Sequence, residues 1–202
     1  MKKTTIPNFS SDEYLRVLNK LNPQNSKACN NNLLWNNSSS NTFSGIFKGF
    51  SFKRSNLKYA RFENAVFDHC NFTGSLFESV VFNSNTNLTS VNFLRSKFNK
   101  CEFKSNEVQH AMNFSSCIIE NCVYNGNTIR GSYFNNSKIY NTKFINQKII
   151  STSFDNCYFK DVIFDKCNIK NLNLEFATFD NVSLIDTQIS FYQLPYIIGI
   201  FS

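Results

Sequence analysis

Large apolar residues recur at every fifth position through most of this chain. The spacing starts at Phe47, shifts by one residue after Phe82, shifts again after Val108, and then runs unbroken from Phe114 to Ile189. It defines 29 such positions, termed centres, and 17 of the 23 phenylalanines occupy one of them. A period of five fits neither an α-helix nor a single β-strand. A fixed short period instead predicts a solenoid, in which each unit contacts only its neighbours.

A second position in each unit supports this prediction. The residue two positions before most centres, termed the slot, is Gly, Ala, Ser, Thr, Cys or Val. One large and one small inward residue per unit suit a narrow core. Stretches such as Cys70-Asn71-Phe72-Thr73-Gly74 resemble the pentapeptide-repeat family, over roughly residues 43 to 190. The resemblance implies an all-β solenoid, a right-handed quadrilateral β-helix of about seven coils with four pentapeptides in each coil.

The four-sided model makes a prediction about columns of stacked side chains. Successive centres are assigned to faces one to four, and each inserted residue is treated as a bulge that keeps the order of the faces. Two faces then become columns of aromatic rings that interlock along the axis. Coils about 4.8 Å apart would give a rod about 34 Å long. The predicted core stack is Phe52, Phe72, Phe93, Phe114, Phe134 and Phe154 on face two, and Phe62, Phe82, Phe103, Phe144 and Phe164 on face four.

The slot of face one breaks the rule of small residues. It holds Asn106, Asn127 and Gln147 in consecutive coils. Amides at an inward position would be costly if they were left unpaired. We therefore expect a buried ladder in which these three amides bond to the coil above or below.

Both ends of a solenoid need covering, because they expose apolar core. Residues 1–42 are expected to form an N-terminal helical cap and a loop, since Ser10 and Glu13 make a capping box before a helix over 11–21. The repeat itself is assigned to residues 43–190. The apolar segment 191–202 could fold over the last coil, pair with its twin in a homodimer, or dock on a membrane or another partner. Its candidate contact residues are Phe191, Tyr192, Leu194, Tyr196, Ile197 and Ile198.

Composition points to a reducing compartment and offers no chemical site. Six of the seven cysteines occupy slots, where they serve as small fillers, and none is expected to stack on another cysteine. A cytoplasmic location is expected, because free buried thiols suit it and no signal peptide or transmembrane segment is recognisable. Asp68, His69 and Cys70 are adjacent, but alternate residues of a strand face opposite ways, so His69 and Cys70 are not expected to meet. We expect no catalytic residue, no metal site and no cofactor, and therefore no enzyme.

The charge distribution separates the remaining functions. The net charge is +7, and residues 1–113 alone carry 14 basic and 7 acidic side chains, whereas residues 150–202 carry a balance of −3. The preferred interpretation is a scaffold or protein-interaction module with an unknown protein partner, and the insertions near 83–87 and 109–113 are the expected recognition points. The alternative is a DNA-mimicking modulator of DNA gyrase, as in some members of the resembled family, which would need a strongly acidic stripe. Nucleic acid is not expected as a partner, because Arg54, Arg61, Lys97, Lys100 and Lys104 form no concentrated patch along the sequence.

Overall fold

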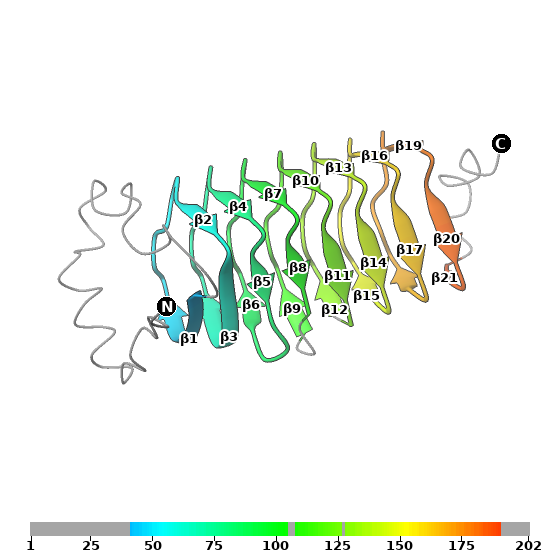
Figure 1. The fold of residues 1–202 in the computed structure, drawn as a ribbon. Coiled ribbons are helices and arrows are strands. Elements are labelled where there is room, and N and C mark those ends of the chain that lie inside the picture. Colours follow the sequence, from blue (N-terminus) through cyan, green and yellow to red (C-terminus); the bar gives the residue numbers. More distant parts are fainter. Residues whose placement is uncertain (1–40, 105–107, 127, 191–202) are drawn as a thin grey trace.

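The computed structural model describes residues 41–104, 108–126 and 128–190, which form a four-sided parallel β-solenoid. The chain winds through seven coils, and the strands of successive coils lie side by side along one axis (Figure 1). Coils are counted from the first one, whose centres are Phe47, Phe52, Leu57 and Phe62. None of the described residues is helical. The helix expected over 11–21 and the segment 191–202 lie outside the described residues.

Face three is a separate sheet of seven short parallel strands. Each strand pairs in register with its counterparts in the neighbouring coils, with Phe77 opposite Phe98 and Phe159 opposite Phe179. The strands are β2 (Asn56–Lys58), β4 (Leu76–Glu78), β7 (Lys97–Asn99), β10 (Ile118–Glu120), β13 (Lys138–Tyr140), β16 (Tyr158–Lys160) and β19 (Thr178–Asp180).

Faces four and one belong to one 14-stranded sheet, because β3 (Ala60–Asp68) runs through the corner between them. β1 (Asn41–Lys48) pairs with β3 on both faces, so the last two residues of the loop expected over 22–42 are strand. Face four continues as β5 (Val81–Phe82), β8 (Glu102–Phe103), β11 (Val123–Asn125), β14 (Lys143–Ile145), β17 (Ile163–Asp165) and β20 (Ser183–Ile185). Face one continues as β6 (Asn87–Thr89), β9 (Val108–His110), β12 (Thr128–Arg130), β15 (Lys148–Ile150), β18 (Asn168–Lys170) and β21 (Gln188–Ile189).

Face two consists of turns joined by single bridges rather than of strands. Asparagine side chains support several of these turns. Asn71 Oδ1 accepts a hydrogen bond from the Thr73 N–H at 2.9 Å, and Asn113 Oδ1 accepts one from the Ser115 N–H at 2.9 Å. These are Asx-turns, in which a side chain takes the place of a backbone partner. Asparagine before the centre therefore stabilises turns on this face.

The corners of the coils use the left-handed backbone conformation. The described positive-φ residues, 22 non-glycine residues and four glycines, all lie two positions after a centre. Eight of the 22 are asparagine, which tolerates this conformation better than most side chains. The corner conformation therefore repeats every five residues and follows each centre.

Stacked rings fill the core, and the eleven residues of the expected core stack are all buried. Ring centroids on face four lie 4.7 Å apart between Phe82 and Phe103 and 4.9 Å apart between Phe144 and Phe164. On face two the separation is 4.7 Å between Phe114 and Phe134. Burial of each ring contributes about 1.5–3 kcal/mol relative to an exposed one.

Hydroxyls in the slots tie each coil to the one before it. Ser75 Oγ donates to the Phe52 carbonyl at 3.0 Å and accepts the Ser55 N–H at 3.0 Å. Ser96 Oγ repeats the pattern one coil later, with the Phe72 carbonyl at 2.8 Å and the Ser75 N–H at 3.0 Å. The slot is thus small because space is short, and frequently Ser or Thr because buried backbone groups need a partner.

Candidate functional surface

The second insertion lies before Val108, not after it. β9 pairs with β12 so that Gln109 faces Ile129, and the Gln109 side chain is fully buried, whereas Val108 is 39% exposed. Ala111 takes the corner conformation two positions after Gln109. The assignment of Val108 as a centre was therefore wrong. Both insertions occupy the corner between faces four and one, so the recognition point expected at 109–113 is not at an insertion.

Two of the three residues expected in the amide ladder, Asn106 and Asn127, lie outside the described residues. The third, Gln147, is buried, and its Nε2 donates to the Ile145 carbonyl at 3.3 Å, while its Oε1 has no partner. The ladder thus remains a prediction. An amide that the sequence pattern missed, Gln109, is buried with neither Nε2 nor Oε1 paired.

Amide ladders do occur on the outside of the rod, after face three. Asn121 Nδ2 donates to Asn99 Oδ1 at 2.8 Å, and Asn141 Nδ2 donates to Asn121 Oδ1 at 2.8 Å. Asn99 Nδ2 in turn donates to Glu78 Oε1 at 3.1 Å. These bonds fix side-chain positions along the corner between faces three and four.

The six described cysteines are free and buried in slots. The expectation that none stacks on another was wrong for one pair. Because β8 pairs with β11 in register, Cys101 and Cys122 occupy the same slot in consecutive coils. Burial, and after it the neighbouring Cys122 thiol, raises the pKa of Cys101. Burial raises the pKa of Cys117 and Cys157 to about 12, so these thiols are protonated at neutral pH. Buried protonated thiols are poor nucleophiles.

Asp68, His69 and Cys70 do not form a reactive cluster. Asp68 lies on the outer surface, where it bonds His69 Nδ1 and pairs with Lys48 Nζ at 3.3 Å. The hydrogen bond from His69 is the main reason that the pKa of Asp68 is lowered. Cys70 points inward and donates to the Phe47 carbonyl at 3.3 Å. The thiol and the imidazole are on opposite sides of the backbone.

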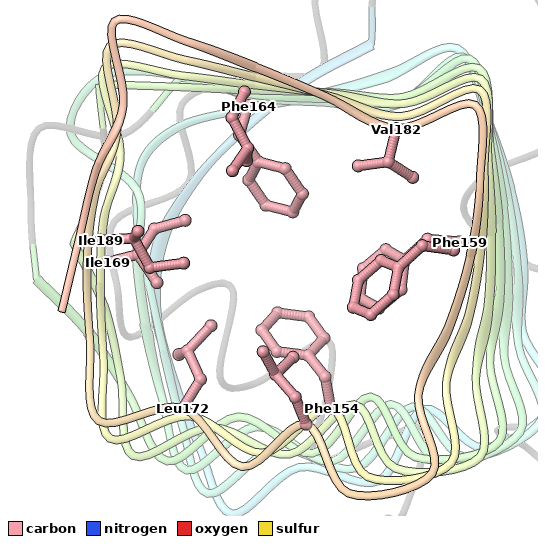
Figure 2. A pocket seen from close by; sticks show the side chains of 10 residues that line it. Phe154, Phe159, Phe164, Ile169, Leu172, Val182 and Ile189 are labelled. Atoms are coloured by element: carbon pink, nitrogen blue, oxygen red, sulfur yellow. The ribbon is translucent and has the colours of Figure 1, made fainter. Parts of the chain in front are cut away.

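The last two coils enclose an apolar hollow. Figure 2 shows Phe154, Phe159 and Phe164 pointing inward from three faces, together with Leu172 and Val182 from slots. Leucines take over from phenylalanine at the centres of faces two and four in the seventh coil, and this smaller volume leaves the space. The candidate cap or dimer residues Phe191, Tyr192, Leu194, Tyr196, Ile197 and Ile198 lie outside the described residues, so their role stays a prediction.

The outer surface holds paired side chains near the C-terminal end of face three. Tyr140 and Tyr158 contact edge to face at 5.8 Å, and Tyr158 Oη donates to Asp180 Oδ2 at 3.1 Å. Lys160 Nζ lies 3.2 Å from Asp180 Oδ2 and is the main cause of the lowered pKa of Asp180. None of the described residues forms a helix long and apolar enough to cross a membrane, and no cluster of three metal-ligating side chains occurs among them.

The geometry defines a class of protein: a four-sided parallel β-solenoid with five residues per side. The family model for pentapeptide repeats matches residues 46–83 in eight copies. The same pattern of inward centres and left-handed corners continues through the remaining described coils. Residues 46–83 thus carry pentapeptide repeats, and the described coils that follow share their geometry.

A comparison with curated proteins gave no match. Among solved structures, a trypsin-treated variant of QnrB1, a plasmid-mediated fluoroquinolone resistance protein, is 12% identical, with a TM-score of 0.46 over 81% of this chain and 96% of that chain. HetL of the cyanobacterium Nostoc, involved in heterocyst differentiation regulation, is 8% identical, with a TM-score of 0.24 over 88% of this chain and 93% of that one. A putative glycosyl hydrolase from Parabacteroides merdae is 10% identical, with a TM-score of 0.35 over 87% and 88%. Because all three scores are below 0.5, the functions in these names are not transferred to this chain.

Proposed function

We propose that the protein is a non-enzymatic scaffold, located in the cytoplasm, whose outer faces bind another protein. The observation that carries this proposal is the rigid display of outward side chains. Corners of fixed conformation and coil-to-coil hydrogen bonds hold these side chains in columns. Within one column, neighbouring side chains are about 4.8 Å apart. Such columns suit recognition by complementary surfaces, which is how solenoid proteins commonly bind partners.

The proposal is tested by site-specific photo-crosslinking in the cells that make the protein. A photoreactive residue replaces one outward side chain at a time: Lys148 on face one, Tyr133 on face two, Lys58 in the first coil and Tyr140 in the fifth coil on face three, and Ile185 on face four. A scaffold gives a discrete crosslinked partner from one face and not from the others. If no position yields a crosslinked protein while all variants stay folded, the scaffold proposal fails.

A second candidate is a DNA-mimicking modulator of gyrase. The observation in its favour is the group of exposed or half-buried carboxylates in the last coils, which includes Asp155, Asp161 and Glu175. The first three coils oppose it, because basic side chains dominate their surface. A mimic of duplex DNA needs negative charge along most of its length, so we place the scaffold first.

A further inference from the structure

Six unpaired cations gather on two faces of the first and third coils. They are called the basic patch: Lys53, Arg54 and Lys58 in the first coil, and Arg95, Lys97 and Lys100 in the third. All six side chains are exposed, and none forms an ion pair with any described residue. Along the sequence these charges look scattered, and the concentration appears only when the coils are stacked.

The turn and corner positions of the second coil, between the two cationic rows, carry small side chains. Gly74 lies between Arg54 and Arg95 in the same corner column, and Thr73 and Ser79 flank it along the second coil. Two coil spacings separate the rows by about 9–10 Å. That separation matches the width of one extended polypeptide. Two carboxylates border the patch among the described residues. Glu78 accepts hydrogen bonds from Asn99 rather than pairing with Lys58, and Glu120 lies opposite Asn99 in the fourth coil.

Backbone conformation gives a second and independent observation. Arg54, Arg95 and Lys100 have φ values of 57°, 58° and 55°, in the left-handed region. Long side chains are uncommon there, and Asn or Gly is preferred. Only one other described Lys or Arg, Lys166, adopts this conformation. Later coils do use asparagine in the same two columns, at Asn136 and Asn121. Residues that oppose a local preference tend to occur at functional sites.

We propose that the basic patch binds an acidic, extended peptide segment of a partner protein. The segment lies over the second coil, and its Asp and Glu side chains reach the cations of the first and third coils. Leu76 and Leu94 are half-buried within the patch and give apolar contacts between the charged ones. The inference rests on the proposed scaffold function and names the class of its partner.

Nucleic acid fits the patch less well. The patch extends over only about 10 Å of the rod, and a duplex laid along face three would also lie over the carboxylates of Glu78, Glu120 and Asp180, which share one column. A single strand would need aromatic platforms, and Tyr59 is the one exposed aromatic side chain near the patch among the described residues. An acidic peptide needs neither a long cationic surface nor exposed aromatic side chains for stacking.

Fluorescence anisotropy tests the proposal with a labelled peptide of about twelve residues that alternates Asp and Glu with Leu. The full-length protein should bind it, with affinity that falls as salt rises. The triple variant Arg54→Asn, Arg95→Asn, Lys100→Asn should weaken binding at least about tenfold, because three charge-assisted contacts are lost. Asparagine suits the left-handed corner, so this variant should stay folded.

The matched control removes the same charge from face one and its neighbouring corner: Lys148→Asn, Lys166→Asn, Lys170→Asn. It should bind the peptide like the wild type. If the corner variant unfolds, a second triple variant replaces it: Lys53→Gln, Lys58→Gln, Lys97→Gln. These residues lie at strand and turn positions, and the same loss of peptide affinity is expected.

Three results would overturn the proposal: no binding of the peptide at about millimolar concentration, equal loss in the control variant, or tighter binding of a single-stranded or duplex oligonucleotide at the same patch. The scaffold function fails separately. A partner crosslinked through face four, with an inert basic patch, would leave the scaffold standing and reject the peptide site.

Discussion

Replacing Gln109 by Leu should stabilise the protein, although it changes a fully buried residue. Gln109 occupies the centre of face one in the fourth coil, between Leu88 and Ile129, and neither polar atom of its amide has a partner. Leu has a similar volume and matches the apolar column. The substitution therefore removes a desolvated polar group without opening a cavity.

The magnitude follows from the unpaired amide. A buried polar group without a hydrogen bond costs about 1–3 kcal/mol. The methylenes of Gln109 are already buried, so the apolar gain from Leu adds about 1 kcal/mol. We expect the free energy of unfolding to rise by about 2–4 kcal/mol.

Urea unfolding followed by circular dichroism measures this change as an upward shift of the midpoint. The conservative swap Ile129→Leu in the next coil is the control, and it should cost less than about 1.5 kcal/mol. A second variant, Val108→Asn, tests the register. It should change stability by less than about 1 kcal/mol, because Val108 faces outward.

Two results would refute the reasoning. A loss of stability in Gln109→Leu would mean that the amide has a partner that stabilises the fold. A large loss in Val108→Asn, with no effect of Gln109→Leu, would mean that Val108, rather than Gln109, is the inward residue of the fourth coil.

Three further experiments test the core and the turns by the same urea assay. Tyr124→Phe removes a buried hydroxyl that has no partner, so it should stabilise by about 1–3 kcal/mol, and a loss would reveal a hidden hydrogen bond. Asn113→Ala breaks the Asx-turn to Ser115 and should cost about 1 kcal/mol, whereas Asn113→Asp keeps an acceptor and should cost less. Cys117→Ser with Cys157→Ser tests pH dependence. The folded thiols have raised pKa values of about 12, so between pH 8 and 10 only the unfolded thiols ionise, and the wild type should lose about 2 kcal/mol per thiol relative to this variant. If the free energy of unfolding of both proteins changed equally with pH, this prediction would be contradicted.

The columns of the core could be predicted from the sequence because the period is rigid. Each centre faces its counterpart one coil later, and the identity of Phe72, Phe93 and Phe114 makes the alignment across both insertions visible. The corner conformation supports the same alignment of centres, because every described positive-φ residue follows a centre by two positions.

The inward residue of the fourth coil on face one could not be predicted from an apolar pattern, because it is polar. Val108 keeps the five-residue spacing, so the pattern places the insertion after it. The first insertion lies at the corner between faces four and one, and placing the second at the same corner would have made Gln109 a centre. The in-register pairing of β8 and β11 sets Cys101 and Cys122 in one slot column, as their separation of one coil plus one inserted residue already indicates.

The basic patch could not be predicted from local sequence. Lys53, Arg54 and Lys58 are about 40 residues away from Arg95, Lys97 and Lys100 in the chain. They become neighbours only because the second coil, with Gly74 at its corner, carries small side chains between them. When the charges are summed over a whole face of seven coils, the cations of the first and third coils are offset by carboxylates elsewhere on that face, so the local patch is not apparent.

The most direct test of the central claim is a titration of the purified protein into a DNA gyrase supercoiling reaction, with and without a quinolone. A scaffold with a basic first half should leave supercoiling and drug inhibition unchanged up to about 100 µM protein, since it cannot imitate the charge of DNA. Inhibition of supercoiling or protection from the drug would contradict that claim and would identify the acidic last coils as the contact with the enzyme.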